Sequence, residues 1–262
     1  MKIFRMYILF LVLLTIIFVT TISLLPTPEG FPILEYHTVT HSPDEGSKKY
    51  NILPSDFSAQ LDYLKENGYN TITTLEYMKA KRGKLKLPEK PIILTFDDGY
   101  KDNYSTMLPI LEAHNMKAVV YVITNEIGNP GYLTVDELRD MQNRGIEIGS
   151  HTANHRPLID ITRSELLHEI RASKYFLEWN GINTVFSFSY PNGIHSDEIV
   201  KILKDNNYLT AVTGDAGLNN FKTNPYLLQR VNIPQPTFGL FEFRLRLLKA
   251  EIAAKLGIFQ HN

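Results

Sequence analysis

From residue 31 onward, short apolar runs alternate along the chain with longer amphipathic segments. The apolar runs are rich in β-branched and aromatic residues, as buried strands are, and they read FPILEY, YNTITT, PIILTF, KAVVYVI, IEIGS, VFSFSY, LTAVTG and QRVNI. Helix start and stop signals mark intervening segments such as TVDELRDMQNRG and TRSELLHEIRASKYFLEWNG. The alternation predicts a parallel sheet covered by helices, and eight short strands favour an α/β barrel over an open doubly wound sheet.

Two amphipathic segments carry more specific expectations. In SDFSAQLDYLKENG we expect Ser55 or Asp56 to cap a helix and Gly68 to end it. The late segment TFGLFEFRLRLLKAEIAAKLGIF is amphipathic and basic near its middle. That pattern favours an outer helix of the barrel, with a surface lying against a membrane as the alternative.

The first 25 residues favour a membrane anchor. Residues 6–25, MYILFLVLLTIIFVTTISLL, are uncharged and match the roughly 20 residues that span a bilayer. Lys2 and Arg5 precede them, as positive residues on the cytoplasmic side do. A signal peptide usually has an apolar core of about 7 to 15 residues and a small-residue cleavage site, and SLLPTPEG contains no such site. We expect a retained single-pass anchor at the cell membrane with the rest of the chain outside the cytoplasm; the alternatives are secretion after cleavage and a buried core helix.

Composition limits what the rest of the chain can be. The chain has 262 residues, of which 44% are hydrophobic, enough for one domain of barrel size, which we place at residues 33–262 after a Pro-rich linker at 26–32. With 27 basic and 28 acidic residues, the chain lacks the excess of basic residues that is typical of proteins that bind nucleic acids. It has no cysteine, so any metal site must use histidines and carboxylates.

Polar residues follow several of the predicted strands directly. They are His37 after ILEY, Asp97 and Asp98 after IILTF, His151 after IEIGS, and Pro191 and Asn192 after FSFSY. In α/β barrels the chemistry lies at the carboxyl ends of the strands, so we expect these residues to share one rim. Each alone has an ordinary explanation, since an Asp pair before Gly is often a turn or a cap. Their joint occurrence favours a functional site.

The sequence HTANH indicates a metal centre on this rim. His151 and His155 are four residues apart and can bind one ion if the segment turns helically. With Asp98 they would leave one position open, which is the ligand count of catalytic rather than structural zinc sites. Phosphoester hydrolases often bridge two ions with several carboxylates, whereas this chain offers one Asp-His-His set.

These motifs carry a family resemblance. TFDDGY, SHTANH and FSYPNG, in this order and spacing, resemble the leading motifs of the polysaccharide deacetylase family, the NodB-homology metal-dependent carbohydrate esterases. LEYH and the stretch from GDAGLNN to LLQRVNI look like the circularly permuted branch that includes the poly-β-1,6-N-acetylglucosamine deacetylases. The resemblance covers about residues 31–235. It implies a distorted (β/α)7 barrel, here preceded by the N-terminal transmembrane helix.

The resemblance also implies residue roles in hydrolysis of an acetamide. Asp98, His151 and His155 would hold one divalent ion, usually zinc, and Asp97 would be the general base that deprotonates the activated water.

Three further roles carry over from the resemblance. The backbone N–H of Asn192 would stabilise the oxyanion, and His37 would protonate the departing amine. Alternatively, His37 is a structural residue hydrogen-bonded at a strand end. Arg230 matches an Arg of the permuted branch; it either orients Asp97 or forms a surface ion pair.

The chain departs from the family pattern in its third motif, which usually has an Arg before the Pro-Tyr pair and an aromatic residue after the Pro. Here the segment reads SFSYPNG, and the late Leu-x-His motif is also absent. The expected function is metal-dependent N-deacetylation of N-acetylglucosamine units in an extracellular or cell-wall polysaccharide. Two alternatives stay open: a catalytically impaired glycan-binding barrel, and a metal-dependent hydrolase of another small amide or ester.

Overall fold

A parallel sheet forms the centre of the computed structural model, which describes residues 4–7, 10, 13–14, 20–21, 30–43 and 48–257. Its strand order is β10 (Val231–Asn232), β1 (Ile33–Tyr36), β5 (Pro91–Phe96), β6 (Val119–Val122), β7 (Glu147–Ser150), β8 (Ser187–Ser189) and β9 (Thr210–Val212), and β4 (Asn70–Thr71) pairs with the start of β5. Every pairing in this sheet is parallel. Each of the eight predicted runs contains one of these strands, and the parallel α/β sheet is confirmed.

The two ends of this strand order lie close together. The N–H of Leu228 donates to the carbonyl of Ala211, at 3.0 Å, and the N–H of Thr213 donates to the carbonyl of Leu228, at 2.9 Å. Three residues later, Val231 pairs with Leu34 on β1. One stretch of chain, residues 228–232, therefore contacts β9 and β1 in turn and curves the sheet into a partial barrel.

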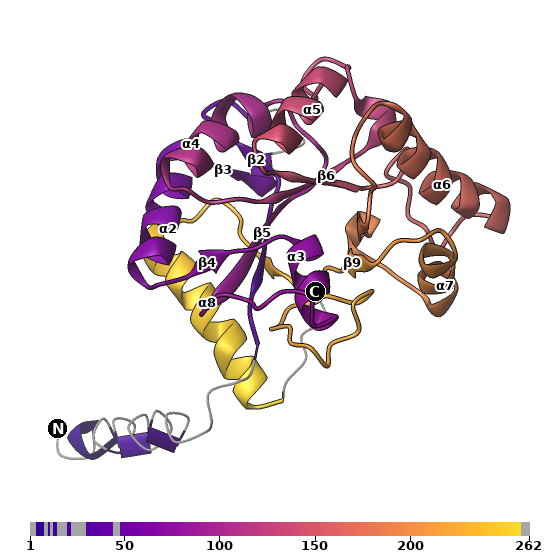
Figure 1. Cartoon of the computed structure of the whole chain (residues 1–262). Coiled ribbons are helices and arrows are strands. Elements are labelled where there is room, and N and C mark those ends of the chain that lie inside the picture. Colours follow the sequence, from indigo (N-terminus) through magenta and orange to yellow (C-terminus); the bar gives the residue numbers. More distant parts are fainter. Residues whose placement is uncertain are drawn as a thin grey trace.

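Helices surround the strands (Figure 1). They are α2 (Pro54–Glu66), α3 (Thr74–Lys81), α4 (Leu108–Ala113), α5 (Val135–Asn143), α6 (Arg163–Trp179), α7 (Asp197–Asp205) and α8 (Leu240–Lys255). Shorter elements connect them: β2 (Thr38–Val39), β3 (Asn51–Ile52), a π-helical turn η2 (Asn103–Met107), and the 3-10 turns η1 (Lys48–Tyr50), η3 (Thr124–Glu126) and η4 (Pro191–Gly193). The predicted cap of α2 is wrong, because the helix begins earlier, at Pro54, where a proline costs no hydrogen bond.

The predictions for the N-terminal segment concern mainly residues that the structure does not describe. Most of residues 6–25, the predicted anchor, lies outside the described residues. Within the part of the chain that the structure describes, no helix is both long and apolar enough to cross a bilayer. At the end of the predicted linker, Phe31 is buried and exchanges backbone hydrogen bonds with Asn219. The retained anchor stays a prediction.

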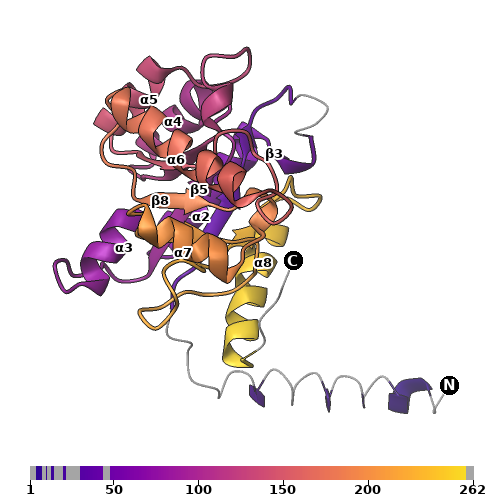
Figure 2. The same cartoon turned by 90° about the vertical axis from the view of Figure 1, so that its right-hand side faces the viewer.

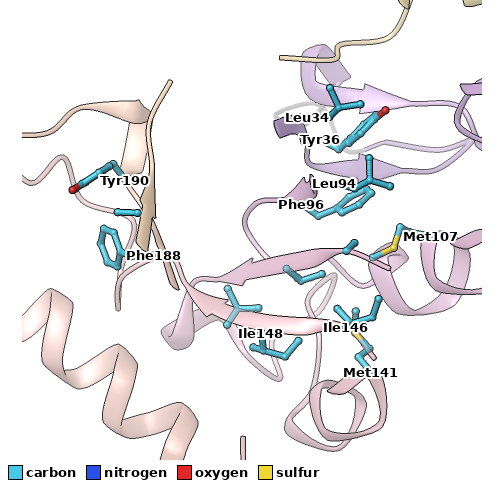
Figure 3. Packing of buried hydrophobic residues seen from close by; sticks show 14 of the residues in the cluster. Leu34, Tyr36, Leu94, Phe96, Met107, Met141, Ile146, Ile148, Phe188 and Tyr190 are labelled. Carbon is cyan, nitrogen blue, oxygen red and sulfur yellow. The ribbon is translucent and has the colours of Figure 1, made fainter. Parts of the chain in front are cut away.

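Alternation along the strands separates two apolar layers. Leu34, Tyr36, Leu94 and Phe96 belong to the large cluster between the sheet and the outer helices, where Figure 3 shows them side by side. A second cluster inside the curved sheet combines strand residues of the opposite parity with two residues of α3. Its members are Phe31, Ile33, Ile72, Tyr77, Met78, Ile93, Val119, Tyr121, Val212 and Leu228. Glu35 on β1 and Thr95 on β5 continue the inner parity toward the carboxyl ends of the strands. The inner face therefore becomes polar where the predicted site lies.

Candidate metal and catalytic site

Asp98, His151 and His155 converge at the ends of β5 and β7. The Nε2 atoms of His151 and His155 lie 3.6 and 3.7 Å from Oδ1 of Asp98. One ligand atom from each of the three residues lies within 4.8 Å of the others. The two imidazole rings are 4.7 Å apart, centre to centre. The structure thus brings together the three predicted metal ligands.

The atoms at the centre of this group fit a cation. Oδ1 of Asp98 is buried and has no hydrogen-bond partner among the described residues. Nδ1 of His151 donates to the carbonyl of Ser189, at 2.8 Å, which leaves the lone pair of Nε2 directed to Asp98. Burial lowers the pKa of His151 and so favours the neutral form that binds metals. Two imidazole nitrogens and one carboxylate oxygen are a suitable donor set for a divalent ion with open positions.

The backbone between the two histidines is not a helical turn, contrary to the expectation. Thr152 and His155 have φ values of 69° and 56°, in the left-handed region. A carboxylate from α6 holds this loop: Glu169 accepts hydrogen bonds from the backbone N–H groups of Ala153 and Asn154, at 3.1 and 2.8 Å, and from the side chain of Asn154. Glu169 is 2% exposed. Glu169 is not among the predicted site residues. A charged residue on the apolar face of a predicted helix is the sequence feature that could have identified it.

A left-handed turn also explains how adjacent acids reach one site. Asp98 and Gly99 have φ values of 73° and 79°, so the chain reverses its local twist immediately after β5. A Cβ atom at Gly99 would lie 2.8 Å from Cγ1 of Val122, so the position requires glycine on two grounds. This turn lets Asp97 and Asp98 both approach His151, at 3.9 and 3.6 Å.

Asp97 is held by an arginine and a serine. Nη1 and Nη2 of Arg230 lie 2.9 Å from Oδ1 and Oδ2 of Asp97, and the hydroxyl of Ser189 donates to Oδ2 at 2.9 Å. Burial by itself would raise the pKa of Asp97, but Arg230 and then His151 hold it well below its usual range. Asp97 is therefore an ionised, buried carboxylate with a fixed orientation.

Arg230 is 1% exposed, so the surface ion-pair interpretation is wrong. Its Nε donates to the carbonyl of Thr213, at 2.9 Å, and its Nη2 lies 3.4 Å from Oε1 of Glu35. The guanidinium thus approaches two carboxylates. The Arg missing from the third motif has a counterpart here, contributed by the segment before β10.

His37 also lies near Asp97. One ring nitrogen of His37 and one carboxylate oxygen each from Glu35 and Asp97 lie within 4.8 Å of one another. The His37 ring stacks on Tyr50, with centroids 4.6 Å apart. We do not assign a metal ion to this group, because Arg230 already supplies positive charge to both carboxylates. Glu35 is not a predicted site residue; it shares the strand parity of His37, which was the available signal.

Asn192 lies in η4, immediately after β8 and hence at the same ends of the strands. Its φ of 57° is left-handed, and a Cβ atom on the following Gly193 would lie 2.3 Å from the backbone nitrogen of Gly214. The segment therefore packs backbone against backbone. The role of Asn192 as an oxyanion donor stays a prediction.

Together these residues offer three chemical functions. The ionised carboxylate of Asp97 lies 3.9 Å from His151 of the candidate cation site, and the His37 imidazole has a ring nitrogen within 4.8 Å of the same carboxylate. Such a group can polarise a carbonyl, accept a proton from water and deliver a proton to a leaving group.

Comparisons with known proteins agree with this arrangement. The family model described as "Polysaccharide deacetylase" matches residues 84–211. The chain is 31% identical over 206 residues to the Bacillus subtilis (strain 168) protein named "Putative polysaccharide deacetylase YxkH", covering 79% of this chain and 72% of that protein. It is 27% identical over 173 residues to the poly-β-1,6-N-acetyl-D-glucosamine N-deacetylase of Staphylococcus epidermidis, covering 61% and 60%. His37 and Arg230 lie outside the residues that the family model matches.

Solved structures are similar over most of the chain. The Streptococcus pyogenes deacetylase PplD, determined in complex with acetate, superimposes with a TM-score of 0.76 at 28% identity, covering 86% of this chain and 99% of that one. A polysaccharide deacetylase from Bacillus cereus gives a TM-score of 0.74 at 28% identity, covering 84% and 69%. Both comparisons extend beyond residues 84–211 to most of the partial barrel.

Proposed function

The chain belongs to the polysaccharide deacetylase family, hydrolases of carbon–nitrogen bonds other than peptide bonds, and we propose that it deacetylates N-acetylglucosamine units of an extracellular or cell-wall polysaccharide. The observation that carries the proposal is the convergence of Asp98, His151 and His155 beside a carboxylate held by Arg230. The similarity to the staphylococcal enzyme supports the proposed substrate class.

Asp98, His151 and His155 would hold one divalent metal ion. Zinc is the best candidate, because two imidazoles and one carboxylate are a common ligand set of catalytic zinc. When bound, such an ion lowers the pKa of water toward neutrality and polarises a carbonyl oxygen. The protein's contribution is to place Nε2 of both histidines within 3.7 Å of Oδ1 of Asp98, with Nδ1 of His151 hydrogen-bonded to the carbonyl of Ser189.

Asp97 is the proposed general base. Its carboxylate is ionised, and Arg230 and Ser189 hold its two oxygens, so it can accept a proton from the attacking water without reorienting. Removing that proton allows the water oxygen to bond to the acetamide carbon. The backbone N–H of Asn192 is the proposed donor to the resulting oxyanion.

His37 is the proposed general acid. The tetrahedral intermediate collapses when its carbon–nitrogen bond breaks, and the departing amine must receive a proton. His37 has a ring nitrogen within 4.8 Å of the Asp97 carboxylate, which places an imidazole and the base in one site. The products are acetate and the free amino sugar of the polymer.

We also propose a location. Residues 6–25 are uncharged and about as long as a bilayer-spanning segment, and Lys2 and Arg5 precede them. A retained anchor would keep the catalytic domain at the outer surface of the cell membrane. Cleavage after this segment would instead release a secreted enzyme.

Acetate release by the full-length protein in detergent tests the proposed activity. Poly-β-1,6-N-acetylglucosamine, chitin oligomers and peptidoglycan are the substrates, each with and without chelation followed by zinc. We expect release that chelation abolishes, zinc restores and Asp97→Asn lowers by roughly 10² to 10⁴. No release from any substrate, with zinc still bound, would favour a glycan-binding barrel; release only from a small acetylated amide or ester would favour the other alternative.

A further inference from the structure

Helix α8 carries a second apolar face that the protein does not cover. Phe243, Leu247, Ala250 and Ala253 are buried against the rest of the domain. On another side lie five large side chains that are 74, 61, 45, 48 and 45% exposed, namely Phe238, Phe241, Leu245, Leu248 and Leu256. Within α8 and its C-cap, spacings of four, three and eight residues keep Phe241, Leu245, Leu248 and Leu256 on one face, and Phe238 lies just before the helix. We call these five residues the outer stripe.

Such a stripe is uncommon on a surface that faces only water. In the described part of the chain, the other long run of exposed large apolar residues is at positions 4–14, within or beside the proposed anchor. The two regions are therefore chemically alike, although more than 200 positions of sequence separate them.

Positive charge accompanies the outer stripe. Residues 240–257 include four basic and two acidic residues, and one of the acids, Glu242, is paired with Arg246 at 2.9 Å. At 100° per residue, the exposed residues Arg244 and Lys249 lie on opposite sides of the stripe. An apolar line between basic residues is the pattern of a helix that lies in the headgroup region of an anionic membrane.

Gly30, the first described residue after the proposed anchor, lies next to α8. Gly30 lines one pocket of about 200 Å³ together with Leu247 and Glu251 of α8. Leu25 and Gly30 are five residues apart, so their Cα atoms are separated by at most about 18 Å. A bilayer that contains residues 6–25 must therefore come close to α8, which runs along the outer flank of the domain (Figure 2).

We propose that the outer stripe lies on the surface of an anionic bilayer into which residues 6–25 insert. This inference rests on the membrane attachment proposed above and adds a second contact that fixes how the domain is oriented. The contact uses α8, whereas the proposed site lies at the carboxyl ends of β5 and β7.

A second copy of the chain is a less suitable occupant. In a two-fold dimer both copies contribute the same surface, so the interface would contain two copies each of the positively charged Arg244 and Lys249. Anionic headgroups instead complement both residues while the acyl region receives the apolar line. Charge complementarity thus favours the bilayer.

The absence of cysteine from the chain permits a direct test. Leu245→Cys and Leu248→Cys place a single spin label on the outer stripe, and Trp179→Cys places one on α6, where the native side chain is 87% exposed. The full-length protein is reconstituted into vesicles of phosphatidylglycerol and phosphatidylcholine. We expect labels at 245 and 248 to collide about tenfold less often with a water-soluble nickel chelate than the label at 179, and more often with oxygen.

Charge reversal provides a matched comparison. Arg244→Glu with Lys249→Glu should restore nickel collisions at position 248, whereas Lys201→Glu on the distant α7 should not. Acetate release from a soluble oligomer is measured throughout and should not change, which separates this inference from the proposed activity. Equal nickel access at 248 and 179 in vesicle-bound protein would overturn the second contact alone. Failure of the chain to bind vesicles would overturn the attachment as well, and a dimer that shields both labels in detergent would assign the stripe to a second copy.

Discussion

Arg230 contacts both carboxylate oxygens of Asp97, at 2.9 Å each, although 133 positions of sequence separate the two residues. Asp97 directly follows β5 and Arg230 directly precedes β10. In the sheet, β1 lies between these two strands. Both side chains are almost fully buried, so the pair fixes the charge and the orientation of the proposed base together. An arginine from the late part of the chain thereby takes the place of the one that the third motif lacks.

Loss of the Arg230 charge should shift the pH dependence of the reaction. Arg230 opposes the effect of burial on Asp97, so in Arg230→Gln the pKa of Asp97 should rise and the acid limb of kcat/KM should move to higher pH. The pair should also stabilise the fold above about pH 3.9, the unfolded pKa of Asp, and this contribution should fade as pH falls toward the lower folded pKa. A pH–rate profile measures the first effect.

Arg230→Lys is the control, because it keeps the charge but loses the two-point contact and should shift the acid limb less. If Arg230→Gln destabilises the fold by the expected roughly 3 to 5 kcal/mol, the Lys variant still permits the kinetic comparison. An unchanged acid limb in both variants would contradict the assignment of Asp97 as the base.

Removal of a proposed ligand should empty the metal site. Purified protein should contain about one divalent ion per chain, and His151→Ala, His155→Ala or Asp98→Asn should remove most of it. His168→Gln, an exposed histidine on α6, should retain the ion. Mass spectrometry measures the metal content of each variant. Full occupancy in all three ligand variants would contradict the proposed metal site.

The proposed acid should be needed for chemistry but not for metal binding. In His37→Ala we expect kcat to fall by roughly 10² to 10⁴, the usual contribution of a positioned acid or base, with the metal content and the fold preserved. Asp97→Asn should behave similarly. Wild-type activity in His37→Ala would exclude His37 and require another proton source.

The loop that presents both histidines should depend on Glu169. The two backbone N–H groups donate to one oxygen of Glu169 and the side chain of Asn154 donates to the other, and an amide has only one oxygen that can accept, so Glu169→Gln should weaken zinc affinity by about 10 to 100-fold. His168→Gln, its neighbour on the exposed side of α6, serves as the control. Zinc titration and thermal unfolding in chelator separate a loss of ligand placement from a general loss of stability; unchanged zinc affinity would show that the loop keeps its shape without the carboxylate.

The sequence by itself determined the strands and the collection of polar residues at one rim. Apolar β-branched runs form strands wherever a sheet can bury them, and a parallel sheet brings the carboxyl ends of successive strands to one side. Asp97, Asp98 and His151 each follow such a run directly, so their approach required only the parallel topology that the strand–helix alternation predicts.

Only the tertiary structure decided how those residues are held. The loop with left-handed backbone at Thr152 and His155 is held by hydrogen bonds to Glu169, a residue of α6. The burial of Arg230 depends on residues 228–232 contacting β9 and β1 in turn. Periodicity and capping act between residues a few positions apart, whereas these contacts join residues that meet only after the helices and strands have packed.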